Sequence, residues 1–247
     1  RAAARGYRSG MMQEPEALRR FDPFDIFDTE AERLDRYFSS LDEAGWSRPS
    51  RCEGWSVRDV LAHLAGEELY NQACLDKDLD GFYEMLEREG VQGGFDEFNR
   101  WCVRKRRSLP VDQVLEEWRT RNRDTRRRMR ELGRDGLLHT SVGPYPAGLQ
   151  AFHYASEYAT HADDVGAPVA EEESARRLEW RAVFGLVALA EHGSAARVER
   201  ADGRFLVRTA DRTAELSPAE FVDATVARLP AGHPLDPALR SALRCLA

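Results

Sequence analysis

Apolar side chains recur at helical spacing through the first two thirds of the chain. The first such stretch begins after Asp28, which is suited to cap a helix, and it runs to about Gly45. Ser56 and Asp59 have the spacing of a capping box, so they predict that a second helix starts there. Both patterns are typical of helices that bury one face against a partner.

Three further segments complete the helical part of the chain. The acidic segment 76–94 contains four glycines and predicts a short helix between loops. A third main helix, or a broken pair, is expected over 95–108 and 110–132, where apolar positions form a bundle-like seam. The Pro/Gly-rich segment 140–148 predicts a loop, and a last long helix is expected over about 146–164.

The pattern changes after the acidic stretch 171–173. A helix is expected over about 174–192, followed by short segments in which polar and apolar residues alternate. These segments predict two to three strands, at 196–200, 204–209 and 213–216. The Ser-Pro pair at 217–218 predicts the start of a helix that reaches about Arg228, and the Asp-Pro pair at 236–237 predicts a last short one.

These elements predict a mainly α fold, in which a four-helix bundle is followed by a small α+β domain. The bundle is expected over 28–170 and the α+β domain over 174–247. Residues 1–27 are treated as an N-terminal extension, either left from cloning or disordered, because the first methionines are Met11 and Met12.

The composition is that of an ordinary globular protein, with 42% apolar and 32% charged residues. No apolar run approaches the roughly 18 residues of a membrane helix, so no membrane partner is expected. The N-terminal residues lack the apolar stretch of a signal peptide, which favours a cytoplasmic location. Four cysteines without CxxC pairing then favour free thiols over disulfides or a cysteine zinc site.

The net charge of −7 argues against a nucleic-acid partner. One local exception is the segment 119–130, which holds seven arginines, with a basic run at 104–107 before it. Acidic residues are interspersed with both runs, which favours a solvated helix face with ion pairs between neighbouring turns. The alternative is a wall that recognises carboxylates of a small substrate or of a thiol cofactor.

The residues with the most chemical potential lie in the helix expected at 146–164. His153, Glu157 and His161 are each four residues apart, so they share one face of that helix. Glu157 and His161 are able to point at one common metal ion. A catalytic zinc site has three protein ligands and an open position, so another helix must supply the third. His63 is a candidate, although a single histidine beside an apolar face is usually a core residue.

Two motifs give the chain a resemblance to a known family. The first is PSRCEGWSVRDVLAHL at 49–64, and the second is Glu157-x-x-x-His161-x-x-Asp164. In order and separation they resemble the mycothiol-dependent maleylpyruvate isomerase family, within the DinB-like metal-binding four-helix bundles. The helical pattern of that family covers about residues 28–192, and the C-terminal segment looks like the smaller α+β domain that many members carry.

The resemblance implies that His63, Glu157 and His161 correspond to the metal ligands of the family. Zinc is the usual metal, and another divalent metal is the alternative. The resemblance also implies that mycothiol, or a similar low-molecular-weight thiol, is a co-substrate. No residue of this sequence is identified as binding the thiol.

Three other residues near the motifs are weighed separately. His153 is not one of the three ligands of the family, and it is read as an extra ligand, a general base or a filler of the bundle. Asp164 lies one turn after His161, where it either orients that imidazole or is a polar residue near the helix end. These two are the candidates for catalytic roles. Cys52 is expected to be a small half-buried residue rather than a nucleophile.

The predicted chemistry follows from the three ligands. Two neutral imidazoles and one carboxylate leave a zinc site with a net charge near +1 and an open position, where a thiol loses its proton. The expected function is that of an S-transferase or a cis–trans isomerase of the maleylpyruvate isomerase type. Its partners are an electrophilic small molecule and the thiol, and the protein is expected to be a monomer or a homodimer. The alternatives are a metal-dependent hydrolase on the same bundle and a non-enzymatic metal-binding bundle.

Overall fold

The computed structural model describes residues 15–246 of the chain. The chain divides into two compact units, one over Pro23–Pro168 and one formed by the residues from Val169 onward with the segment before Pro23. The described residues are mostly helical, which confirms the predicted mainly α fold. Each helix in this part of the chain is too short or too polar to cross a lipid bilayer.

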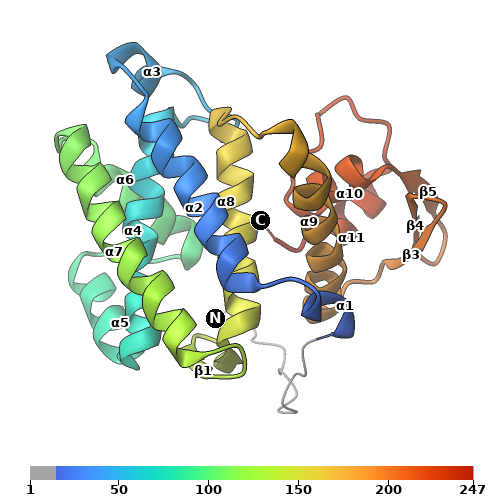
Figure 1. Cartoon of the computed structure of the whole chain (residues 1–247), viewed down its shortest axis with the longest axis horizontal. Coiled ribbons are helices and arrows are strands. Elements are labelled where there is room, and N and C mark those ends of the chain that lie inside the picture. Colours follow the sequence, from blue (N-terminus) through green and yellow to red (C-terminus); the bar gives the residue numbers. More distant parts are fainter. Residues whose placement is uncertain (1–14, 247) are drawn as a thin grey trace. The chain divides into compact units, whose positions relative to one another are not determined.

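Four long helices form the core of the first unit (Figure 1). They are α2 (Pro23–Ser39), α4 (Val57–Asp76), α7 (Val111–Leu132) and α8 (Ala147–Val165). Helix α2 packs against α8 and α7, and α4 packs against α7, so the apolar faces of the helices cover one another. The predicted four-helix bundle is therefore confirmed.

Local sequence signals determine where α4 begins and α8 ends. The Ser56 side chain accepts a hydrogen bond from the backbone N–H of Asp59, and the Asp59 carboxylate accepts one from the backbone N–H of Ser56. This is the predicted capping box. Helix α8 ends at Gly166, whose φ of 77° lies in the left-handed region that glycine adopts without strain. The two ends fix which side chains of each helix point into the bundle.

Shorter elements connect the four long helices. They are the helices α3 (Glu43–Ser47), α5 (Leu79–Arg88) and α6 (Phe95–Arg106) and the strands β1 (Leu137–Thr140) and β2 (Gly143–Pro146). Helices α5 and α6 pack against α4 through an apolar cluster that contains Phe82, Phe98 and Trp101. This cluster covers the side of α4 that the other long helices leave uncovered.

Two sequence-based expectations for the first unit are wrong in detail. The single helix expected from Asp28 to Gly45 is divided, because α2 ends at Ser39 and the Asp42 side chain caps α3 by accepting from Gly45 N at 2.7 Å. The segment expected to be a loop at 140–148 contains the strand β2, paired antiparallel with β1. Prolines are tolerated there because each strand of a two-stranded ribbon has an open edge.

The second unit is a small α+β structure. It contains α1 (Glu16–Arg19), α9 (Glu171–Glu191), β3 (Arg197–Ala201), β4 (Arg204–Arg208), β5 (Thr213–Leu216), α10 (Pro218–Thr225) and α11 (Pro237–Leu243). The three strands form an antiparallel sheet in sequence order. Its core includes Phe205 of β4, which stacks on Phe221 of α10 with ring centroids 4.2 Å apart. The helix expected to reach Arg228 ends at Thr225.

The prediction that residues 1–27 form an extension outside the fold is wrong for residues 15–27. Leu18 of α1 is fully buried, and α2 begins at Pro23. Arg20 forms an ion pair of 2.6 Å with Glu179, which joins this segment to α9 within the second unit. The stretch is too short to show a helical period, so its burial was not visible in the sequence. The remainder of the proposed extension, residues 1–14, lies outside the described residues.

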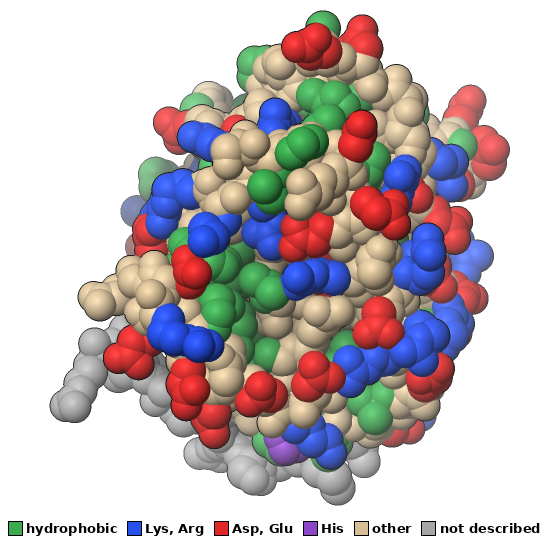
Figure 2. All heavy atoms as spheres, turned by 90° about the vertical axis from the view of Figure 1, so that its left-hand side faces the viewer, with side chains coloured by type: hydrophobic (Ala, Val, Ile, Leu, Met, Phe, Trp, Pro, Cys, Tyr) green, Lys and Arg blue, Asp and Glu red, His purple; other side chains and the backbone are tan. Residues whose placement is uncertain are grey.

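The arginines of α7 lie opposite acidic side chains. Ion pairs join Arg119 to Asp35, Arg126 to Asp28, Arg128 to Asp76, and Arg130 to Asp25 and Asp28. Figure 2 views the molecule from the left-hand side of Figure 1, and it shows basic and acidic side chains interleaved on that face. Several of these pairs connect α7 to α2. The structure therefore favours the interpretation of this segment as a solvated helix face with ion pairs over that of an anion-recognising wall.

Candidate metal centre

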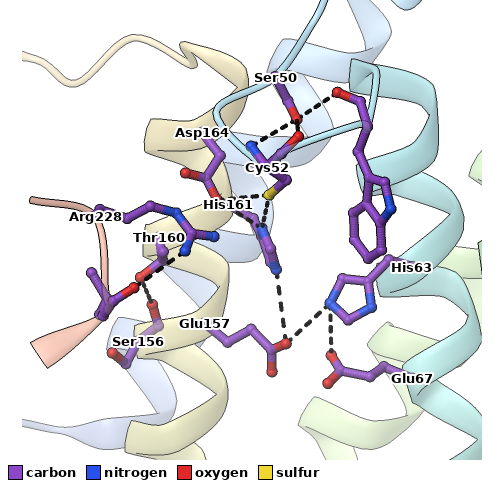
Figure 3. A network of polar contacts seen from close by, with 12 residues as sticks. Ser50, Cys52, His63, Glu67, Ser156, Glu157, Thr160, His161, Asp164 and Arg228 are labelled. Atoms are coloured by element: carbon purple, nitrogen blue, oxygen red, sulfur yellow. Dashed lines mark hydrogen bonds and ion pairs between the residues drawn. The ribbon is translucent and has the colours of Figure 1, made fainter. Parts of the chain in front are cut away.

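His63 on α4 faces two side chains of α8 across the bundle (Figure 3). Its Nε2 lies 3.2 Å from Oε1 of Glu157, and the same oxygen lies 3.8 Å from Nε2 of His161. The two imidazole rings meet edge to face, with centroids 4.9 Å apart. One donor atom from each of the three residues lies within 4.8 Å of the others. The structure therefore brings together the three residues predicted as metal ligands.

Helix geometry explains why these side chains converge. Glu157 and His161 are one turn apart on α8, so their side chains lie one above the other. His63 and His161 are both buried, whereas the Glu157 side chain is 28% exposed. The pair of histidines is therefore held by the packed interior, and Glu157 keeps part of its side chain in contact with solvent.

Two residues contact the far side of the His161 ring. Nδ1 of His161 lies 3.1 Å from Oδ2 of Asp164, whose side chain is fully buried. The thiol of Cys52 donates to the same oxygen at 3.1 Å and lies 3.7 Å from His161 Nδ1. A carboxylate at Nδ1 holds a proton there and leaves Nε2 facing Glu157. The predicted proximity of Asp164 to His161 is thus present, and Cys52 joins the same group.

The protonation states of His161 and Glu157 depend on the ionisable groups that contact them. Burial alone lowers the pKa of His161, but Asp164, Cys52 and Glu157 together outweigh burial and raise that pKa to about 10. Burial raises the pKa of Glu157, but contact with His63 and His161 outweighs it and lowers the pKa to about 2. Without a metal, a proton on His161 therefore balances the Glu157 carboxylate.

His63 differs from His161 in both charge and hydrogen bonding. Burial lowers the pKa of His63, so the neutral ring is favoured. Within residues 15–246, Nδ1 of His63 is buried and has no hydrogen-bond partner. The ring of Trp55 lies beside His63, with centroids 5.3 Å apart. A neutral ring with one nitrogen facing Glu157 fits a metal ligand, because a ligand histidine must offer an unprotonated nitrogen.

Glu67 is a fourth ionisable group at the centre. It lies one turn after His63 on α4, and its Oε2 is 4.0 Å from Nε2 of His63. Burial and the neighbouring Glu157 raise the pKa of Glu67 well above its ordinary value. The two carboxyl groups lie close enough that the charge on Glu157 disfavours a charge on Glu67, a situation that a bound cation relieves.

His153 has a different environment from the other histidine of α8. Its Nε2 lies 3.2 Å from the hydroxyl oxygen of Tyr145 on β2, and the two rings are 5.9 Å apart. The groups of donor atoms close enough to share an ion, among the described residues, contain His161 but not His153. These contacts favour the interpretation of His153 as a packing residue of the bundle over that of an additional metal ligand on α8.

The donor set suits a divalent metal. Imidazole nitrogens and a carboxylate oxygen are usual ligands of zinc, and three of them leave a position for a further ligand. The two crowded carboxyl groups, Glu67 and Glu157, are the observation that a purely structural cluster does not explain. Metal sites in four-helix bundles are built from inward-pointing donors on facing helices, which is the arrangement of these three residues.

Comparison of the sequence with known families identifies the relatives of this bundle. The sequence profile described as the mycothiol maleylpyruvate isomerase N-terminal domain matches residues 27–166. The chain therefore belongs to this family. The matched region contains His63, Glu157 and His161. A comparison with curated protein sequences gives no match.

Solved structures show the same fold. A crystal structure of the mycothiol-dependent maleylpyruvate isomerase is 16% identical, with a TM-score of 0.59 over 85% of this chain and 90% of that one. A histidine-to-alanine variant of that isomerase is 16% identical, with a TM-score of 0.50 over 66% of this chain and 68% of that one. The first alignment extends beyond the bundle, so the likeness in fold includes residues of both units.

Sequence reasoning missed two members of the centre. Glu67 was visible as the residue four positions after His63, the same spacing that drew attention to Glu157 and His161. Cys52 gave no local signal, because it contacts residues of α8 more than a hundred positions further along the chain. Its place within the first family motif was the only indication.

Proposed function

We propose that this protein is a metal-dependent enzyme that uses a low-molecular-weight thiol, such as mycothiol, as a nucleophile toward an electrophilic small molecule. The observation that carries this proposal is the convergence of His63, Glu157 and His161 within 4.8 Å, in a chain that belongs to the mycothiol maleylpyruvate isomerase N-terminal domain family. The solved relative is named as a mycothiol-dependent isomerase, and its fold supports the same kind of chemistry here.

The side chains of the centre have distinct parts in this proposal. His63 and His161 offer Nε2 lone pairs, and Glu157 offers a carboxylate oxygen from the more exposed side. Asp164 keeps a proton on Nδ1 of His161, which directs the other nitrogen toward Glu157. These residues would hold zinc or another divalent ion, which would supply the positive charge that favours a thiolate at neutral pH.

The reaction depends on the electrophile. For a substrate with an activated cis double bond, the thiolate sulfur bonds to carbon, the former double bond rotates, and elimination of the thiolate gives the trans isomer. For a halide, formation of the carbon–sulfur bond expels halide ion. For an epoxide, it breaks one carbon–oxygen bond, and the resulting alkoxide takes up a proton to become a hydroxyl. With either electrophile the product is a stable thioether. The ligand set is the same in both cases, so the proposal covers an isomerase and an S-transferase.

The hydrolase alternative requires a general base beside the metal, and His153 was the residue considered for that role. Its hydrogen-bond contact with Tyr145 gives it a separate environment from the three ligands. We therefore do not assign His153 a part in the reaction. A substitution of His153 is expected to leave metal content unchanged.

The first test is the metal content of the purified protein, measured by elemental analysis for the wild type and for the variants His63→Ala and His161→Ala. Near-stoichiometric zinc in the wild type, lost in both variants, supports the three-residue site. His139→Ala is the matched control, because His139 is an exposed histidine on β1 of the same unit. The absence of bound metal in a folded wild type, including after incubation with zinc, would refute the metal site.

The second test is thiol dependence. With metal bound, the enzyme is assayed for consumption of maleylpyruvate and of epoxide or halide electrophiles, with and without mycothiol. Turnover only when the thiol is added supports the proposal, and the product distinguishes isomerisation from thioether formation. Hydrolysis of an ester or amide substrate without thiol would instead favour the hydrolase alternative.

A further inference from the structure

The loop before α4 is closed on itself. Pro49 and Ser56 form an antiparallel bridge, and Trp55 O accepts hydrogen bonds from both the backbone N–H and the side chain of Ser50, at 2.9 and 2.8 Å. The backbone N–H of Cys52 donates to the Ser50 hydroxyl at 3.1 Å, and Trp55 N donates to Cys52 O at 3.0 Å. These contacts fix the direction of the Cys52 side chain.

The same loop is also attached to the end of α8. The backbone N–H of Arg51 donates to the backbone oxygen of Asp164 at 2.9 Å, and the Cys52 thiol donates to the Asp164 carboxylate at 3.1 Å (Figure 3). The loop leads directly into α4, which carries His63. One short segment therefore contacts both helices that supply the metal ligands.

Asp164 is the residue through which this loop reaches the centre. Its buried carboxylate oxygen Oδ2 accepts from Cys52 and from Nδ1 of His161, each at 3.1 Å. A buried carboxylate is costly unless hydrogen bonds satisfy it, and their directions decide where its oxygens point. Without the thiol, Oδ2 loses a donor that helps to hold it against the imidazole.

We propose that Cys52 is a positioning residue of the metal centre, whose thiol holds Asp164 in the orientation that keeps His161 Nδ1 protonated and Nε2 directed at Glu157. This inference rests on the proposed function, because it assigns a purpose to the orientation of His161. It assigns Cys52 the role of a hydrogen-bond donor with its proton on sulfur. The thiol takes no part as a nucleophile.

The alternative interpretation is that Cys52 and Asp164 bind a second metal ion. Cys52, His161 and Asp164 also form a group with donor atoms within 4.8 Å of one another. The hydrogen-bond interpretation is favoured because the closest contacts, both 3.1 Å, each join a donor to a carboxylate oxygen. A metal ion at this place would instead have to displace the thiol proton of Cys52 and the proton on Nδ1 of His161.

The test compares Cys52→Ala, which removes the donor, with Cys52→Ser, which retains one. Cys245→Ala is the matched control, because Cys245 is a half-buried cysteine of the second unit. Metal affinity is measured by competition with a chromophoric chelator, and metal equivalents are counted by elemental analysis. We expect Cys52→Ala to weaken metal binding about tenfold, the low end for loss of an outer hydrogen-bond partner. Cys52→Ser and the control are expected to stay within about twofold of the wild type.

A second readout needs no metal. We expect the ring proton on Nδ1 of His161, hydrogen bonded to a carboxylate, to give a downfield proton NMR resonance that Asp164→Asn removes. We expect Cys52→Ala to shift this resonance and Cys52→Ser to restore it. A protein that binds no metal would refute the proposed function, while this resonance would still decide the role of Cys52.

Several outcomes would overturn the inference. One is that Cys52→Ala leaves both the metal affinity and the ring-proton resonance unchanged. Another is that a second metal equivalent is present in the wild type and is lost in both Cys52→Ala and Cys52→Ser, which would make the sulfur a ligand. A loss of affinity in Cys245→Ala as large as that in Cys52→Ala would show that the effect is unspecific.

Discussion

Two buried polar clusters lie in the same bundle, and neighbouring residues of α4 belong to different ones. Glu67 lies at the metal centre, near His63 and Glu157, whereas Glu68 lies in a second cluster with residues of α7 and α8. Both glutamates are enclosed by the fold, but their partners differ in kind. The comparison shows how a structural polar cluster differs from a ligand site.

Neutral donors surround Glu68. Its Oε1 accepts from Asn122 at 2.8 Å and from Tyr158 at 3.0 Å, and its Oε2 accepts from Thr125 at 2.6 Å. The Tyr158 hydroxyl in turn accepts from Trp118 at 2.9 Å. Burial raises the pKa of Glu68, while these hydrogen bonds act in the opposite direction. Both carboxylate oxygens of Glu68 therefore have neutral hydrogen-bond donors.

Ionisable groups surround Glu67 instead. The two histidines lower the pKa of Glu157, and Glu157 in turn raises the pKa of His161. Nδ1 of His63 has no hydrogen-bond partner among the described residues. A cluster of this kind is incomplete without a proton or a cation. The difference teaches that the charge of the partners, rather than burial alone, separates a candidate centre from a structural network.

The largest expected effect on the stability of the metal-free protein is that of Glu68→Gln. The amide presents an NH2 group where the carboxylate accepts a hydrogen bond, so at least one of the donors Asn122, Thr125 and Tyr158 loses its acceptor. We expect the free energy of unfolding of the metal-free protein to fall by about 2 kcal/mol. Urea unfolding monitored by tryptophan fluorescence measures it. A stability equal to that of the wild type, or metal content reduced in the folded variant, would break the comparison.

Asp164→Asn is expected to weaken metal affinity by about 10- to 100-fold, or roughly 1.4 to 2.7 kcal/mol. The asparagine amide is able to donate to Nδ1 of His161, which favours a proton on Nε2, the nitrogen that faces Glu157. Chelator competition measures the change. Asp163→Asn is the control, because Asp163 is the neighbouring acidic residue outside the donor groups of the centre. Equal affinities for Asp164→Asn and wild type would show that this contact does not support the centre.

Much of the bundle and half of the candidate centre could be predicted from local pattern. The spacing of Glu157 and His161 on one helix and the capping box at Ser56 depend on residues within one or two turns. His63 is a different case. It lies four residues before Glu67 on α4, a spacing that is as consistent with a hydrogen bond between these two side chains as with a metal site. It became a candidate because the pair on α8 needs a third ligand from another helix, and the resemblance to a family then assigned it that place.

The remaining features depend on contacts that a linear pattern does not contain. Nothing local distinguishes Glu67 from Glu68, since both are glutamates of one helix and only the helices packed against them differ. Cys52 meets Asp164 across 112 positions of sequence. Burial of Leu18 likewise depends on a short segment that packs with the distant α9. Tertiary packing therefore decides these cases.

Metal affinity is expected to rise with pH. In the metal-free protein the pKa of His161 is about 10, so this ring is protonated near neutral pH and must lose a proton when a metal binds. One released proton per ion raises the affinity about tenfold for each pH unit, or about 1.4 kcal/mol, between roughly pH 6 and 9. The number of protons released per zinc ion is measured directly with a pH indicator in weak buffer. A flat affinity over this range would contradict the assigned charge of His161.

The smallest expected effect is that of Glu67→Gln, which has the opposite sign to the same change at Glu68. Because the pKa of Glu67 is raised in the folded protein, its contribution to stability is complete below the ordinary value of 4.5 and is lost as the pH rises through the raised pKa. Glutamine stays neutral and removes that loss. We expect the metal-free variant to equal the wild type in stability near pH 4.5 and to exceed it at pH 8.

Urea unfolding of the metal-free proteins at both pH values checks this, with Glu68→Gln measured in parallel. If Glu67→Gln lowers the free energy of unfolding at pH 8 as Glu68→Gln does, then Glu67 has satisfied hydrogen bonds like those of its neighbour. The two clusters would then be of one kind, and the crowded carboxyl groups would no longer distinguish the metal centre. A gain that grows with pH would instead show that the folded protein keeps an unfavourable carboxyl pair at this position, which a bound cation relieves.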